Sequence, residues 1–340
     1  MHNEIVKRKK ALFPTLFMSA EERKAFQANM AAQVDQNNLG GSAAPIWQII
    51  SPEAIDAVSK KYFDLSRTNH VVEGYIPAAP GVRPVVNVEV ITGAGSAIKN
   101  ATNWDQSDMD NKYVPVTMDR YSRPFGLSSY DLMHGERIQT KIGAAIEAVV
   151  GAVVKDFFLV VQNSLSAPPS ATATPTATGG AFLTIPSDFG PEYVAGTLSA
   201  IFGGYGPVDD LILDPTLFAK LVPTNALSLG TEPGSYGIEY IHRTAGIPVG
   251  LKGFALRKNA VAAAFGVPSY DELTGIAVQD LGRVAGIPII LKTWTNKGSE
   301  VIYNSVETLA GFKVANTLSI AGFYDASPAA VGEGTDPSGD

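Results

Sequence analysis

The feature that most constrains the fold is an apolar pattern that repeats without a break over residues 129–165. Its members recur every three or four residues, as on one face of an α-helix: Ile138, Ile142, Ile146, Val149, Val153, Phe157 and Val160. At about 1.5 Å per residue, the helix would be on the order of 50 Å long. Because this length exceeds the width of a compact small domain, the sequence predicts an elongated subunit.

A strand leads almost directly into this helix, in the stretch VTMDRYSRPFGLSSYDLMHGE at 116–136. Only Arg123-Pro124 and Gly126 interrupt the transition, so we expect the strand to end there. Ser128, three residues before Asp131, is the predicted N-cap of the helix.

Two alternating segments before the helix predict a two-stranded arm. Val86, Val88 and Val90 alternate with Asn87 and Glu89, and Val114, Val116 and Met118 alternate again before Arg120. The connection of roughly 20 residues between them is too long for a tight turn, so the arm has a long tip. Because isolated two-stranded ribbons are marginally stable in water, we expect this arm to pack outside its own domain.

The N-terminal segment predicts a short amphipathic helix. Ser19-Ala20-Glu21-Glu22 has the pattern of a capping box, and a narrow apolar stripe follows: Phe26, Met30 and Val34. This helix is either a docking arm or an ordinary surface helix of its own domain. A second helix starts at Ser51-Pro52-Glu53, with proline at its first position.

The chain after the low-complexity stretch 167–180 alternates between strands and helices. We expect a buried strand at 211–213, a helix starting at Asp214-Pro215, and short strands at 254–265 and 275–279. Two strands, 287–295 and 300–304, form a hairpin, and 312–314 and 318–323 close the same sheet. Beyond Tyr324 the residues are small, polar or acidic, which predicts disorder.

Composition argues against most kinds of reactive site. The chain has no cysteine, and its 4 histidines show no paired ligand spacing, so we expect no catalytic, cofactor-binding or metal site and no enzyme. The net charge of -7 disfavours general attraction to nucleic acid phosphates. The longest apolar run, 144–161, contains Glu147, Lys155 and Asp156, which makes it a poor membrane span.

The order of these parts resembles the major capsid protein of tailed bacteriophages, with its Hong Kong 97-like α+β fold. The stretches PVTMDRYSRPFGLSS and IGAAIEAVVGAVVKDFFLVV resemble the family's E-loop return strand and spine helix. LILDPTLFAKLV resembles an A-domain strand and helix, and SVETLAGFKVANTLSIAGF resembles the closing P-domain strands.

The resemblance implies a division of the chain into named parts. These are an N-terminal arm (1–45), the first part of the P domain with a short helix (46–84), the E-loop (85–124), the spine helix with a linker (125–185), the A domain (186–285), the P-domain strands (286–325) and a disordered acidic tail (326–340).

The resemblance also implies a function and partners. Copies of the chain would assemble, as hexamers and pentamers, into an icosahedral shell that encloses double-stranded DNA without sequence-specific binding. The shell would form in the host cytoplasm and become part of the virion, away from any membrane. A short stretch precedes the arm helix, so we expect a separate scaffolding protein; a portal is also implied, with room for a decoration protein. The candidate subunit contacts are Phe26, Met30, Val34, Lys99, Arg120 and Arg123.

Three other readings stay open. An encapsulin-type nanocompartment would have the same fold but enclose protein cargo, so co-purifying nucleic acid or cargo separates the two. An α/β enzyme or binding protein would need a constellation of His, Asp, Arg or Ser residues, which the sequence does not show. A tail protein would not need the long helix.

Overall fold

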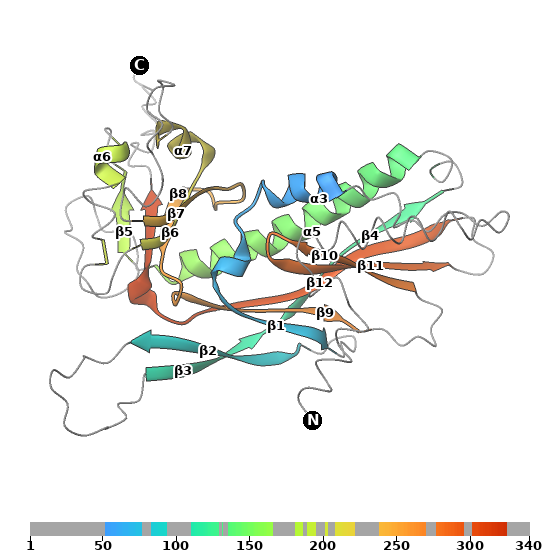
Figure 1. The fold of residues 1–340 in the computed structure, drawn as a ribbon, viewed down its shortest axis with the longest axis horizontal. Coiled ribbons are helices and arrows are strands. Elements are labelled where there is room, and N and C mark those ends of the chain that lie inside the picture. Colours follow the sequence, from blue (N-terminus) through green and yellow to red (C-terminus); the bar gives the residue numbers. More distant parts are fainter. Residues whose placement is uncertain are drawn as a thin grey trace, which may run out of the picture.

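The computed structural model describes residues 52–76, 83–93, 110–128, 131, 135–165, 181–185, 189–194, 201–202, 208–221, 238–269, 277–295 and 301–324. These residues form a longer sheet, a shorter sheet, a hairpin and one long helix, so the predicted α+β class is confirmed. The longer sheet and the helix run along the molecule, and the shorter sheet lies at one end (Figure 1). The predicted N-terminal arm, the hairpin tip and the acidic tail lie outside the described residues.

The longer sheet is built around β12 (Ile302–Val314), a strand of 13 residues that spans on the order of 43 Å. On one side β12 pairs antiparallel with β4 (Asp119–Leu127). On the other side it pairs antiparallel with β11 (Ile287–Thr295) and then with β9 (Val261–Pro268). The outer strands are β10 (Ala277–Val284), antiparallel to β11, and β1 (Asn69–Ile76), parallel to β9.

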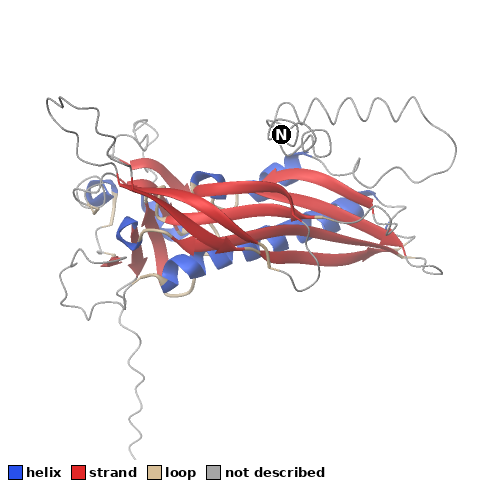
Figure 2. Ribbon diagram, turned by 90° about the horizontal axis from the view of Figure 1, so that it is seen from below, coloured by secondary structure: helices blue, strands red, loops and turns tan. Residues whose placement is uncertain are grey.

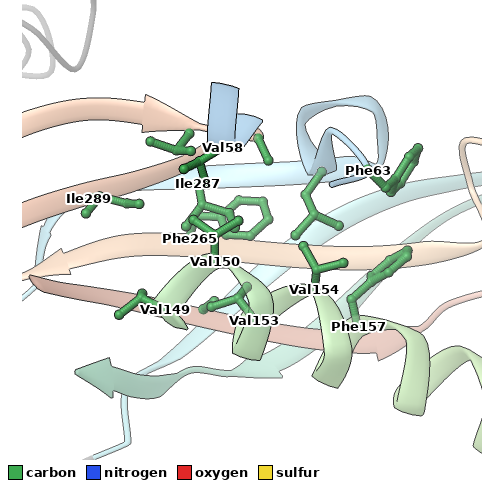
Figure 3. Packing of buried hydrophobic residues seen from close by; sticks show 14 of the residues in the cluster. Val58, Phe63, Val149, Val150, Val153, Val154, Phe157, Phe265, Ile287 and Ile289 are labelled. Carbon is green, nitrogen blue, oxygen red and sulfur yellow. The ribbon is translucent and has the colours of Figure 1, made fainter. Parts of the chain in front are cut away.

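The predicted long helix is confirmed as α5 (Gly135–Asn163), whose 29 residues extend over about 44 Å. All but one of the predicted stripe residues are buried against the sheet, and Val160 is half-buried. Figure 3 shows Val150 of α5 next to Phe265 of β9, and Val154 belongs to the same buried cluster. The short helix α3 (Pro52–Ser59) begins where the sequence predicts and adds Ile55 and Val58 to the same core.

The hairpin covers the other face of the longer sheet. Its strands are β2 (Val85–Gly93) and β3 (Asp110–Thr117), paired antiparallel as predicted. Their inward valines are buried against small residues of β9 and Leu309 of β12: Val88, Val90, Val114 and Val116 against Ala262 and Ala264. The expectation that the arm has no packing partner in its own domain is therefore wrong for its described part. Each fully buried valine stabilises the contact by about 1.5–3 kcal/mol, which offsets the weakness of a lone ribbon.

Three layers result, with strands in front of the long helix when the molecule is seen from below (Figure 2). β9 lies in the middle layer, so all eight of its residues are buried. Its alanines 262 and 264 face the hairpin, while Ala263 and Phe265 face α5.

The shorter sheet has the order β5 (Ala181–Thr184), β13 (Ile320–Tyr324), β8 (Leu251–Leu256), β6 (Val208–Leu213) and β7 (Ile238–Arg243). Next to it lie the short helices α6 (Pro191–Tyr193) and α7 (Pro215–Leu221). The predicted start of α7 is confirmed, because Asp214 Oδ1 accepts the backbone N–H of Leu217 at 2.7 Å.

The membership of the two sheets differs from the sequence expectation in two places. β13, predicted to close the P-domain sheet, lies in the shorter sheet. β9 and β10, predicted inside the A domain, lie in the longer sheet. The physical reason is that alternating apolar and polar residues determine which face of a strand is buried, but do not determine which strand pairs with it. The chain passes between the two sheets from β8 to β9 and again from β12 to β13. These two connections lie side by side, because Arg257 N–H donates to Ser319 O of η8 (Thr317–Ser319) and Ala315 N–H donates to Ala260 O.

Candidate assembly surface

The hairpin, the edge of the longer sheet and the long helix form one continuous unit. Met118, whose side chain is buried, is the only residue between β3 and β4. The chain therefore passes directly from the hairpin layer into the sheet layer. The expected end of the strand at Arg123-Pro124 is wrong, since β4 continues to Leu127. Pro124 is tolerated because β4 is an edge strand, where a residue without an N–H loses no inner hydrogen bond.

The crossing from β3 to β4 depends on Gly311 of β12. A Cβ at this position would overlap the carbonyl oxygen of Thr117 and would lie 2.8 Å from its carbonyl carbon and 3.0 Å from Met118 Cα. Because these neighbours are backbone atoms, they cannot turn aside as a flexible side chain can. The glycine therefore lets the hairpin layer cross β12 at close range.

An ion pair fixes the start of β4. Arg120 Nη2 lies 2.6 Å from Glu307 Oε2 of β12, and the side chain of Glu307 is only 3% exposed. A carboxylate buried this far needs a charged or hydrogen-bonding partner to offset the loss of water. Arg120 supplies that charge from within the same chain.

A second contact ties β4 to the long helix. Tyr121 Oη donates to Asp156 Oδ2 at 2.7 Å. Burial, with this hydrogen bond to a carboxylate, raises the pKa of the Tyr121 phenol above its usual value. Tyr121 thus stays neutral and acts as a donor that holds α5 against the edge strand.

The turn from β4 into the helix is closed by a reciprocal cap. Asp131 N–H donates to Ser128 Oγ at 3.3 Å, and Ser128 N–H donates to Asp131 Oδ2 at 2.9 Å, the reciprocal bonds of a capping pair. The described part of α5 begins further on, at Gly135, so the role of Ser128 as its N-cap stays a prediction. Lys141 Nζ of α5 donates to the same carboxylate at 2.8 Å and to Gly126 O at 3.1 Å. Lys141 first, and then the Ser128 bonds, hold the pKa of Asp131 well below its usual value.

The structure places only two of the six predicted contact residues. Phe26, Met30, Val34 and Lys99 lie outside the described residues. Arg120 and Arg123 both lie in β4, three residues apart, so they point to opposite faces of the sheet. Their role between subunits stays a prediction.

Other exposed side chains mark the hairpin's outer face. Val85 of β2 is 60% exposed and Tyr113 of β3 is 63% exposed. Sequence reasoning missed both, as it missed the buried Glu307. The available signal for Glu307 was a single carboxylate within the otherwise uncharged run 301–312.

Solved structures provide the matches to this chain. No family model matches it, and no curated protein matches its sequence. The virus-like particle from Pyrococcus furiosus is 16% identical, with a TM-score of 0.45 over 80% of this chain and 96% of that chain. The capsid of cyanophage P-SCSP1u is 13% identical, with a TM-score of 0.42 over 78% of this chain and 89% of that chain. A structure from Mycobacterium phage Che8 is 13% identical, with a TM-score of 0.40 over 84% and 93%.

Two further observations concern sites of other kinds. Within the described ranges, His, Asp and Glu side chains form no group of three that could hold a metal ion. None of the helices in the described part of the chain is long and apolar enough to span a membrane.

Proposed function

We propose that this chain is the major capsid protein of a tailed double-stranded DNA bacteriophage, present in many copies in a closed icosahedral shell. The observation that carries the proposal is the continuous unit of hairpin, edge strand β4 and helix α5, laid along an elongated sheet with a smaller sheet at one end. This order of elements supports the proposal, because the sequence resemblance implies an E-loop, a spine helix, a P domain and an A domain.

The exposed side chains and the small cavity of the subunit suit a shell protein more than an enzyme. The hairpin leaves Val85 and Tyr113 exposed on its outer face, where a second copy can bury them. A cavity beside Arg67 and Asp210, between the two sheets, measures about 10 Å³. That is room for about one water, whereas small-molecule sites are roughly 300–1,000 Å³. On the order of the elements and this exposed outer face, we propose a structural role without enzymatic activity.

The proposal includes the contents and partners of the shell. A net charge of -7 suits a shell that encloses DNA without gripping its phosphates. Hexamers and pentamers of the chain, a scaffolding protein and a portal would complete the particle, with decoration optional. Assembly would take place in the host cytoplasm before the virion is released.

The test is assembly of the purified chain, alone and with the scaffolding protein of its own phage. Light scattering and negative-stain microscopy should show shell-sized particles. A species that stays monomeric in every assembly condition would refute the proposal. Nuclease-resistant DNA in particles from infected cells supports a phage capsid, whereas protein cargo without DNA indicates an encapsulin-type shell.

A matched pair of variants tests the hairpin surface. Tyr113→Asp places a charge on the exposed outer face and should abolish or strongly reduce assembly without unfolding the subunit. Tyr113→Phe keeps the ring and should assemble normally. Equal assembly of both variants would show that this face is not a subunit contact.

A further inference from the structure

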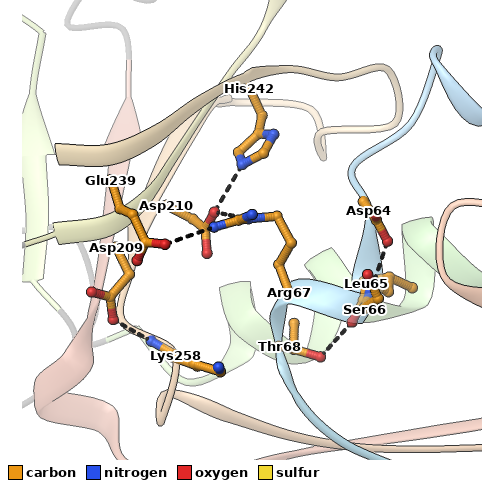
Figure 4. Close-up of polar contacts among 10 residues, drawn as sticks. All are labelled: Asp64, Leu65, Ser66, Arg67, Thr68, Asp209, Asp210, Glu239, His242 and Lys258. Carbon is orange, nitrogen blue, oxygen red and sulfur yellow. Dashed lines mark hydrogen bonds and ion pairs between the residues drawn. The ribbon is translucent and has the colours of Figure 1, made fainter. Parts of the chain in front are cut away.

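A polar cluster joins the two sheets at one place. Arg67 belongs to η3 (Leu65–Arg67), which leads into β1 of the longer sheet, yet its side chain reaches across to the shorter sheet. Figure 4 shows the guanidinium between η3 and strands β6 and β7. Arg67 Nε donates to Asp210 Oδ1 of β6 at 2.6 Å.

Strand β7 contributes three further side chains around this contact. The Arg67 guanidinium carbon lies 3.2 Å from the centre of the Tyr240 ring, which is a close cation–π contact. Glu239 Oε1 lies 3.7 Å from Arg67 Nη2. His242 Nε2 lies 2.8 Å from Asp210 Oδ1, the same oxygen that Arg67 contacts.

The ion pair is largely removed from water. The Asp210 side chain is 6% exposed and that of Arg67 is 23% exposed. A pair this buried adds little net stability, because the loss of hydration offsets much of the attraction. The ion pair instead restricts how the two sheets are oriented relative to each other, because charged hydrogen bonds are short and depend on angle.

The junction also contains backbone hydrogen bonds where the chain passes between the sheets, and apolar contacts, which are less directional. Phe158 of α5 stacks on Phe254 of β8 with ring centres 5.3 Å apart and planes 3° from parallel. Such burial resists separation of the two sheets but depends weakly on their relative angle. A hydrogen bond from Phe63 N–H to the side-chain Oγ1 of Thr244, 3.0 Å long, also joins the segment before η3 to the residue that follows β7.

We propose that Arg67 is a positioning residue, which with Asp210 and Tyr240 fixes the angle between the longer and the shorter sheet. Its role is to select one arrangement of the two sheets from several of similar stability. In a shell, this angle contributes to the curvature of the assembly, and that consequence alone rests on the proposed function.

The chain has no cysteine, so the angle can be measured with two introduced spin labels. Gln139→Cys labels the exposed face of α5, and Lys220→Cys labels α7 beside the shorter sheet. Pulsed electron spin resonance on the free subunit should give one narrow distance distribution. In Arg67→Met/Asp210→Leu, which removes both charges and keeps apolar volume, the distribution should broaden at least twofold while the thermal midpoint stays within a few degrees.

Two further variants complete the design. Arg67→Lys keeps the charge but loses the planar fork and its stacking on Tyr240, so it should broaden the distribution partially. Arg83→Met/Asp119→Leu removes an exposed ion pair, 2.8 Å long, that lies away from the junction, and should leave the distribution unchanged.

An unchanged distribution in Arg67→Met/Asp210→Leu would overturn the proposal. Failure of that variant to fold would overturn it too, since the pair would then be needed for stability and not for angle. Because the measurement uses the free subunit, it stands apart from assembly. Wild-type chain that never forms shells would refute the proposed function and leave the positioning role in place.

Discussion

Adding one methyl group should have opposite effects at two glycines of this chain. Gly143 lies in α5, and apart from its chain neighbours and the adjacent helix backbone nothing lies within 4 Å of a Cβ built there. Alanine at a helical position avoids the entropy cost of glycine, so Gly143→Ala should stabilise the protein by about 0.5–1 kcal/mol. Gly311→Ala must instead displace the backbone at Thr117 and Met118. Overpacking of this kind costs about 1–3 kcal/mol, against a gain of about 0.4–1 kcal/mol from the unfolded chain, so the net change is destabilising.

Urea unfolding followed by circular dichroism would measure both changes against wild type. The unfolding midpoint should rise for Gly143→Ala and fall for Gly311→Ala, with similar slopes. Hydrogen exchange adds location, because amides of 110–118 should exchange faster in Gly311→Ala. A Gly311→Ala protein as stable as wild type would show that β3 does not cross β12 at the described distance. A destabilised Gly143→Ala would show that this face of α5 is covered.

Three further predictions concern single side chains. Because the pKa of Asp131 is lowered on folding, its stabilising effect is present above its unfolded pKa of about 4 and is lost as pH falls toward the lower folded value. Asp131→Asn should therefore lower the thermal midpoint at pH 7 and flatten its decline below pH 4, as scanning calorimetry would show; an unchanged decline would contradict this. Phe158→Ala removes a fully buried ring stacked on Phe254 and should lower the free energy of unfolding by about 3–5 kcal/mol. As a control, Lys155→Ala at an exposed position should change the free energy of unfolding in urea by less than about 0.5 kcal/mol. Glu307→Ala removes the carboxylate of the Arg120–Glu307 ion pair and should lower the free energy of unfolding by about 1–3 kcal/mol in the same assay. An unchanged free energy of unfolding would mean that this ion pair makes no net contribution to stability.

Some of the candidate surface could be predicted from the sequence because it depends on neighbours along the chain. Ser128 and Asp131 are three residues apart, so their reciprocal cap follows from local geometry. Val88 lies between the polar Asn87 and Glu89, and Val114 and Val116 keep the same two-residue spacing, so a buried face of the hairpin was expected. The partner of that face could not be predicted, since the small Ala262 and Ala264 that receive it lie far away in the chain.

By itself, the sequence determined the long helix, the Ser128–Asp131 capping pair, the paired strands of the hairpin and the α+β class. Each of these rests on periodicity or on contacts within a few residues, which the chain encodes directly. Only the tertiary structure decided that Pro124 lies within an edge strand, that β13 joins the shorter sheet, and that Arg67 reaches Asp210 across 143 residues of chain. These outcomes depend on which distant strands pair and how closely their layers approach. An alternating pattern specifies the buried face of a strand, but the neighbour is chosen by the packing of the whole molecule.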